Sequence, residues 1–146
     1  MANNAADTLN MLLRGEISAV ETYRIACEKM TNSQHLRILQ DNLASHEQRA
    51  QRLRECVRRN GGTPAEGSGA WGAFARLWQG GANVLGEGPA IAALEEGEDQ
   101  GLRDYRNQKK LQDLPPDELQ VVHDELLPEQ ERTHRALSEL KAVANA

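Results

Sequence analysis

The sequence has few aromatic residues: only 3% of its 146 residues are Phe, Trp or Tyr, whereas 39% are hydrophobic. A core must therefore be built mainly from Leu, Ala, Val and Ile, as in helical bundles. A chain of this length suits one domain, with a core large enough to be stable without disulfide bonds.

The sequence also lacks an excess of positive charge and a long hydrophobic run. Its formal net charge is -5 and its pI is about 5.4, which argues against a nucleic-acid-binding surface. No stretch approaches the roughly 18 apolar residues of a membrane-spanning helix, and Met1 to Thr8 does not have the charge and apolar pattern of a signal peptide. We expect a soluble, cytoplasmic protein that binds neither nucleic acid nor membrane.

The chain has two cysteines, Cys27 and Cys56. If the first two helices form a hairpin, Cys27 lies near its turn and Cys56 near its far end. At about 1.5 Å per residue the two thiols are then tens of ångströms apart, too far for a disulfide within the subunit. We expect free, inert thiols.

A stripe of mostly apolar side chains runs along the first predicted helix, from about Ala5 to Met30. Its members recur at alternating steps of four and three, as on one face of a helix: Leu9, Leu13, Glu16, Val20, Tyr23, Cys27 and Met30. The carboxylate of Glu16 lies in the middle of this face. Because an unpaired buried charge costs several kcal/mol, Glu16 requires a partner, a proton or a metal ion.

The motif around Glu16 occurs a second time. Gly15-Glu16 is followed after six residues by Tyr23, and Gly97-Glu98 is followed after six by Tyr105. Both copies lie in helix-forming sequence and precede a turn by a similar length. The repeat predicts two related helical hairpins.

The first hairpin turns at Thr31-Asn32-Ser33, and its second helix ends at Asn60-Gly61-Gly62, where a residue can take the left-handed conformation that closes a helix. A glycine-rich crossover follows at about 61–88, with a short helix at Trp71 to Trp78. Such a connection can travel the length of a bundle, so the helices on either side of it need not be antiparallel neighbours. We expect the aromatic side of the short helix to pack on the bundle or to form a homodimer contact.

The second hairpin begins near Pro89, a residue suited to the first turn of a helix, and turns at Leu114 to Asp117. Its last helix contains Pro128, which we expect to kink the helix or to divide it in two. Glu131 and His134 follow the proline at a spacing of three, which places them on one side of the helix.

Side chains that can bind a metal lie at one level of this predicted bundle. Each is about 14 to 19 residues from the turn of its hairpin, and a helix rises about 1.5 Å per residue. They come from four helices: Glu16, His46, Glu98, and the pair Glu131 and His134.

This arrangement resembles the ligand scheme of ferritin-like di-iron carboxylate proteins, in which two helices each supply a Glu and two supply Glu-x-x-His. The Gly-Glu-x6-Tyr motif is similar to the rubrerythrin branch. The chain resembles an uncharacterised bacterial family of rubrerythrin-like proteins, a domain of unknown function, in Leu9 to Glu16, Ser68 to Trp71 and Glu95 to Asp99. The resemblance covers nearly the whole chain. It implies one all-α, ferritin-like four-helix-bundle domain over residues 1–146, built from two hairpins with a long, partly helical crossover.

The resemblance also implies metal ligands and a function. Glu16 corresponds to the ligand on the first helix, and Glu98, with help from Glu95, to the ligand on the third. Glu131 and His134 correspond to the pair on the fourth helix. The implied cofactor is iron, in a di-iron or mononuclear site, or manganese. The implied role is iron handling or oxidative-stress chemistry, in which oxygen or peroxide is reduced.

The second helix departs from this scheme. Aligned on Glu-x-x-His, His46 takes the glutamate position and Arg49 the histidine position; with His46 at the histidine position, Leu43 stands where the glutamate should be. A guanidinium stays charged and cannot bind a metal. If Arg49 points inward, it forms an ion-pair network with Glu16 and Glu98 in a metal-free structural or self-associating bundle. If it extends along the bundle, the remaining donors, His46 among them, hold one or two ions of iron, manganese or zinc. Whether the protein is an enzyme stays open with this choice.

Overall fold

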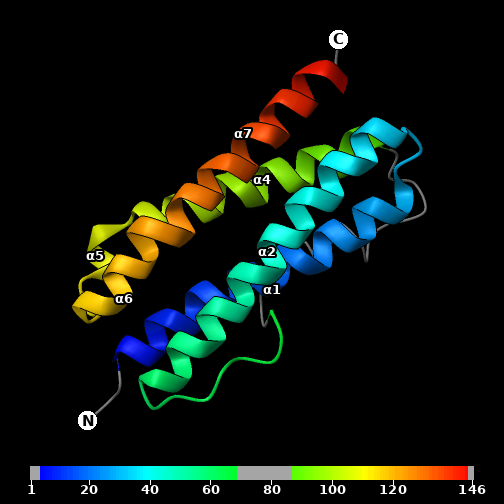
Figure 1. Cartoon of the computed structure of the whole chain (residues 1–146). Helices are drawn as coiled ribbons and strands as arrows, with labels where there is room; N and C mark the ends of the chain where they lie inside the picture. The colour runs from blue at the N-terminus through cyan, green and yellow to red at the C-terminus, as the bar shows by residue number, and fades with distance from the viewer. Residues whose placement is uncertain (1–3, 69–86, 145–146) are drawn as a thin grey trace.

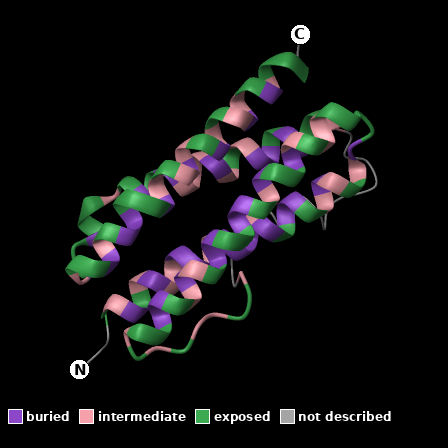
Figure 2. Cartoon of the chain, in the orientation of Figure 1, coloured by how far each residue is buried: buried purple, intermediate pink, exposed green. Residues whose placement is uncertain are grey.

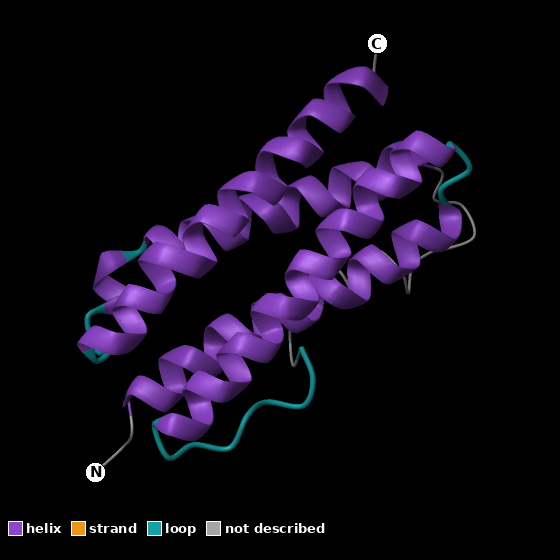
Figure 3. Ribbon diagram, in the orientation of Figure 1, coloured by secondary structure: helices purple, strands orange, loops and turns teal. Residues whose placement is uncertain are grey.

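The computed structural model describes residues 4–68 and 87–144, and this part of the chain is helical and contains no strand (Figures 1 and 3). In chain order the elements are α1 (Asn4–Lys29), α2 (Ser33–Arg59), α4 (Glu87–Arg106), α5 (Gln108–Leu111), α6 (Pro116–Val121), the π-helical turn η1 (Val122–Leu126) and α7 (Leu127–Ala144). No helix in these two ranges is both long and apolar enough to span a membrane. The short helix predicted at Trp71 to Trp78, and the homodimer contact predicted for it, lie outside the described residues.

Two helical hairpins pack side by side to form the bundle. α1 packs against α2, and α4 packs against α7. The hairpins meet where α1 contacts α4 and where α2 contacts α7 (Figure 1). The all-helical prediction is therefore confirmed, and the two halves of the internal repeat lie on different hairpins.

The predicted ends of α2 agree with the structure. Asn32 Oδ1 accepts the backbone N–H groups of Gln34 and His35 at 2.9 and 3.0 Å, which caps the first turn. At the other end Gly61 has a φ of 77°, and the N–H of Gly62 donates to the Val57 carbonyl at 3.0 Å. This is a Schellman motif, in which the left-handed residue is almost always glycine.

The end of α2 and the start of α4 lie at opposite ends of the bundle. Asn10, near the start of α1, donates to the Thr63 carbonyl at 3.0 Å and accepts the N–H of Ala65 at 2.8 Å. Thr31, between α1 and α2, donates its N–H and hydroxyl to Glu87 at 2.6 and 2.5 Å. The connection from α2 to α4 therefore joins opposite ends, and these two helices run in the same direction (Figure 1).

Before Pro128 the last predicted helix is divided into a short first piece, α6, and a longer second piece, α7, by the π-helical turn η1. A proline lacks the N–H for the carbonyl four residues before it, and its ring clashes with that carbonyl. The chain avoids the clash by widening the preceding turn: η1 is π-helical, and the N–H of Leu127 donates to the carbonyl of Val122. α6, η1 and α7 consequently follow one another without a loop.

The buried core consists of two apolar clusters with a polar layer between them. The buried residues of the core occur along all four long helices (Figure 2). One cluster lies towards the start of α1 and includes Leu13, Leu53 and Leu126. The other lies towards the α1–α2 turn and includes Leu39 and Leu137. The buried polar side chains between the clusters come from all four long helices: Glu16, Asn42, His46, Arg49, Glu98, Gln130 and Thr133.

Candidate functional site

The polar layer is centred on His46, which lies between two carboxylates. Its Nδ1 is 2.5 Å from Glu16 Oε1 on α1, and its Nε2 is 2.8 Å from Glu98 Oε2 on α4. All three residues are at most 3% exposed. An ionised carboxylate only accepts hydrogen bonds, so a ring that contacts one with each nitrogen is an imidazolium.

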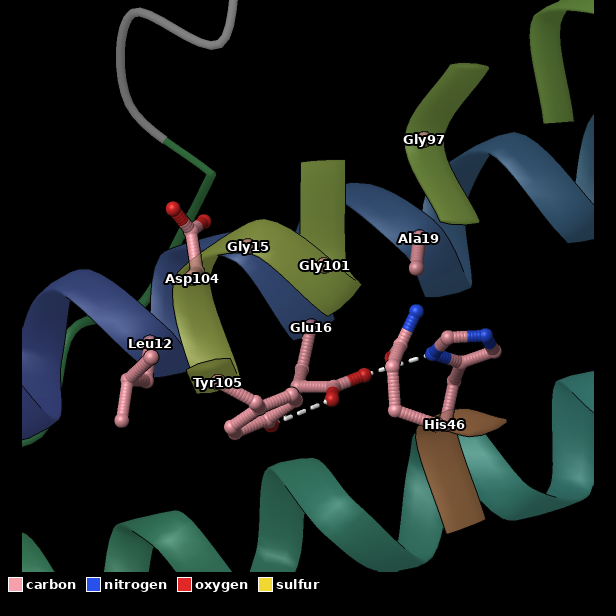
Figure 4. Close-up of a pocket in the computed structure, with 10 residues that line it drawn as sticks. Leu12, Gly15, Glu16, Ala19, His46, Gly97, Gly101, Asp104 and Tyr105 are labelled. Atoms are coloured by element: carbon pink, nitrogen blue, oxygen red, sulfur yellow. Dashed lines mark hydrogen bonds and ion pairs between the residues drawn. The ribbon is translucent and has the colours of Figure 1, made fainter. Parts of the chain in front are cut away.

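The two tyrosines of the repeat bond the carboxylates across the hairpins. Tyr105 on α4 donates its hydroxyl to Glu16 Oε2 at 2.5 Å (Figure 4), and Tyr23 on α1 donates to Glu98 Oε2 at 2.6 Å. Each tyrosine therefore bonds the glutamate of the other copy of the motif. Burial, followed by the charge of the bonded carboxylate, raises the pKa of both phenols well above its ordinary value. Both hydroxyls stay protonated and act as permanent donors.

Arg49 turns into the same layer, one of the two orientations that the sequence left open. Its guanidinium lies 3.5 Å from Glu16 Oε2 and donates to Gln130 Oε1 and, at 3.1 Å, to Thr133 Oγ1. The side chain is 3% exposed. A fixed positive charge is thus buried beside the carboxylates.

Gln130 and Thr133 on α7 belong to the layer, although neither was predicted from the sequence. Gln130 Nε2 donates to the carbonyl and Oε1 of Glu98 at 2.9 and 2.8 Å, and Thr133 Oγ1 is 2.9 Å from the same Oε1. Asn42 on α2, also not selected, donates to the hydroxyl of Tyr23 at 3.0 Å. A signal for the α7 pair was present, because it continues an alternation of four and three along the helix: Leu126, Gln130, Thr133, Leu137 and Leu140.

The structure brings Glu16, His46 and Glu98 together, but the other predicted ligands lie outside the central layer. The side chains of Glu95, Glu131 and His134 are 22–42% exposed. Each makes a contact that links α4 to α7. Glu95 forms an ion pair with Lys141 (2.9 Å) and Glu131 with Arg106 (2.9 Å), and His134 Nε2 lies 2.6 Å from Asp99 Oδ1.

The charges of the layer compensate one another. Burial alone would raise the pKa of both carboxyls, but the charges of Arg49 and His46 outweigh it at Glu16, and the charge and hydrogen bond of His46 outweigh it at Glu98. Both pKa values are therefore lowered. Burial and Arg49 lower the pKa of His46, but the two carboxylates raise it by more. The layer thus contains two anions and two cations, and is neutral as a whole.

The arrangement does not fit a resident metal ion. Both oxygens of each carboxylate and both ring nitrogens of His46 already face hydrogen-bond partners, and an imidazolium has no lone pair to donate. In the ranges that the structure describes, no group of three or more His, Cys, Asp or Glu side chains is placed to hold a metal. The positive charge of the layer is supplied by His46 and Arg49 instead.

A small cavity of about 20 Å³ lies between α1 and α4, beside Glu16 and His46 (Figure 4). Gly15, Gly97 and Gly101 line it, and its volume suits one water molecule. At Gly101 a side chain would force Gln130 to shift: a Cβ there would lie 2.5 Å from Nε2 and 2.7 Å from Cδ of Gln130.

The variant Gly101→Ala should therefore displace Gln130 and break its bonds to Glu98. Because the displaced groups are buried, we expect a loss of about 1–3 kcal/mol in the free energy of unfolding. Urea denaturation followed by circular dichroism measures it. Gly88→Ala in the same helix is the matched control, because a Cβ there meets nothing within 4 Å. Equal stability of the two variants would contradict the proposed contact.

Comparison with known proteins gives a family. Neither a curated protein nor a solved structure matches the chain at a significant level. The family model for the domain of unknown function DUF2383 matches residues 4–110. This range covers most of the chain and contains Glu16, His46, Arg49 and Glu98, whereas the part of α7 that completes the layer lies beyond it. The chain therefore belongs to the DUF2383 family.

Proposed function

We propose that this protein is a ferritin-like four-helix bundle that works without a metal, as a structural protein. Its hairpins are joined by the charged side chains of the polar layer, Glu16, His46, Arg49 and Glu98, which we call the ionic layer. The ferritin-like interpretation is supported by two packed hairpins, by a connection that joins opposite ends of the bundle, and by a layer at mid-height to which all four long helices contribute. The layer has one Glu on each of α1 and α4, and residue pairs spaced by three on α2 and α7.

One observation carries the metal-free interpretation: His46 contacts a carboxylate with each ring nitrogen while Arg49 lies 3.5 Å from one of them. Two cations already neutralise the charges that a metal would neutralise. A buried ionic layer adds little net stability, since desolvation offsets attraction. Its value lies in specificity, because every donor meets its acceptor in only one alignment of the two hairpins.

A second candidate is metal binding for iron handling or oxidative-stress chemistry. The convergence of Glu16, His46 and Glu98 favours it, because two carboxylates and an imidazole suit iron, manganese or zinc. This candidate requires His46 to lose a proton and Arg49 to move away from Glu16.

Metal content decides between the two candidates. The protein is purified without chelator and analysed by elemental mass spectrometry, before and after anaerobic loading with ferrous iron or with manganese. We expect far less than one ion per chain, and a thermal midpoint that neither metal nor chelator changes. One ion of iron or manganese per chain, lost in Glu98→Gln but retained in the exposed control Glu96→Gln, would overturn the metal-free proposal.

A further inference from the structure

A groove of about 450 Å³ lies between α1 and α2, and none of its lining residues belongs to the polar layer. Buried apolar side chains form its base: Ile17, Val20 and Ala50. Exposed or half-buried polar side chains form its rim: Glu21, Arg24, Glu47, Gln51, Arg54 and Glu66. A groove of this size can bury a bound group, and an apolar base with a polar rim suits an aromatic one.

The chain that follows α2 leads into this groove. Asn10 on α1 bonds the carbonyl of Thr63 and the N–H of Ala65. Glu66 then lines the groove together with Ile17, which lies about two helical turns beyond Asn10. Residues 60–68 therefore turn back and advance along the α1–α2 hairpin, from the start of α1 towards its end (Figure 1).

The chain is held again beyond the far end of the groove, where Glu87 accepts hydrogen bonds from Thr31. From Asn10 to Thr31 the hairpin extends about 30 Å, at about 1.5 Å per residue. The stretch of about 20 residues between Glu66 and Glu87 is long enough to cover this distance even if much of it is helical. A path along α1 between the two fixed points passes over the groove.

We propose that this groove binds residues 69–86 of the same chain, which we call the aromatic segment, through Trp71, Phe74 and Trp78. The three residues are spaced by three and four, so a helix would carry them on one side. Arg76 is the only charged residue of the segment, and at about 100° per residue it falls roughly opposite the aromatic side. The proposal goes beyond the proposed function and does not depend on whether the bundle binds a metal.

The groove of the same chain is favoured over that of a second copy because both ends of the aromatic segment are held beside it. Tethering gives an effective concentration of about millimolar. Among the described residues Val143 is the only exposed large hydrophobic residue. The described surface of a second copy therefore offers the aromatic side chains no apolar patch in place of the groove. Within the groove the rings pack on the apolar base, and the guanidinium groups of Arg24 and Arg54 cover them from the rim.

Tryptophan fluorescence reports on the aromatic segment alone, because Trp71 and Trp78 are the only tryptophans of the chain. A nitroxide label on the rim of the groove quenches a tryptophan that it contacts. The test therefore measures the emission of labelled full-length protein before and after ascorbate reduces the nitroxide. The accessibility of the tryptophans of the unlabelled wild type to acrylamide is measured as well.

The label is attached to Gln51→Cys, because Gln51 is exposed on the rim of the groove. The matched control carries the label on Arg135→Cys, which is exposed on α7 away from the groove. Both variants also carry Cys27→Ser, since Cys27 is partly exposed, whereas Cys56 is fully buried and stays in place. Circular dichroism checks that both labelled proteins remain folded.

We expect the nitroxide on Gln51→Cys to remove about half or more of the tryptophan emission, because the rings lie within contact distance of the rim. The label on Arg135→Cys should leave the emission unchanged. In the wild type the tryptophans should be several times less accessible to acrylamide than in the urea-unfolded chain.

Two results would overturn the proposal. One is equal emission of the two labelled proteins, or wild-type tryptophans as accessible to acrylamide as in urea. The other is quenching that passes between chains. It is tested by mixing unlabelled wild type with labelled Gln51→Cys that lacks both tryptophans through Trp71→Phe and Trp78→Phe. Loss of wild-type emission in this mixture would place the aromatic segment in the groove of a second copy.

Discussion

Replacing Glu98 by alanine is expected to lower the free energy of unfolding by about 3–5 kcal/mol, because it removes one partner from a buried ion pair and leaves the other unpaired. Glu98 accepts from His46 at 2.8 Å and from Tyr23 at 2.6 Å, and α7 contributes Gln130 and Thr133 at 2.8 and 2.9 Å. For a chain of this size the thermal midpoint should fall by roughly 10 °C.

Urea denaturation and thermal melting, both followed by circular dichroism, measure the loss. Glu96→Ala provides the control, since Glu96 is exposed in the same helix; its effect should stay within about 0.5 kcal/mol of zero. A loss of less than about 1 kcal/mol in Glu98→Ala would show that Glu98 is not held as an ionised, fully bonded carboxylate.

The helices and the level of the polar layer could be predicted because their signals are local. Asn32 and Gly61 mark the ends of α2 through capping and a left-handed backbone, and neither depends on distant residues. Glu16, His46 and Glu98 interrupt apolar stripes near the middle of their helices. A polar side chain in such a stripe is buried wherever the helix packs, so these three could be selected from sequence.

The members of the layer on α7 could not be selected by looking for metal ligands. Glu131 and His134 match a ligand motif, but each follows the stripe residue Gln130 or Thr133 by one position. Neighbouring residues in a helix differ by about 100° in direction, since one turn takes 3.6 residues, so an offset of one moves a side chain from the core to the surface. The number of residues from a turn determines how far along the bundle a side chain lies, but not whether it points to the core or to the surface.

The orientation of the Arg49 side chain could not be predicted from the sequence either. A long, flexible side chain takes the direction in which its charge finds partners, and those partners, Gln130 and Thr133, come from the other hairpin. The internal repeat did predict two related hairpins. It did not predict that Tyr23 and Tyr105 would each bond the glutamate of the opposite copy, because that exchange depends on how the hairpins dock.

The contribution of the ionic layer to stability is expected to be greatest between about pH 4.5 and 6.5, the ordinary pKa values of Glu and His. The pKa values of Glu16 and Glu98 are lower in the folded protein than in the unfolded chain. Their contribution is therefore present above about pH 4.5 and is lost as the pH falls through the folded values. The pKa of His46 is raised on folding. Its contribution is full below about pH 6.5 and is lost as the pH rises through the folded value.

The contribution of His46 can be measured separately by comparing the wild type with His46→Gln. The free energy of unfolding of both proteins is measured by urea denaturation across this pH range. The glutamine keeps a side chain that can donate and accept hydrogen bonds but cannot titrate. We therefore expect His46→Gln to be less stable at pH 6 and to lose less stability than the wild type when the pH is raised. Parallel curves for the two proteins above pH 6.5 would mean that His46 has the same pKa in the folded and unfolded states, which is incompatible with an imidazolium held between Glu16 and Glu98.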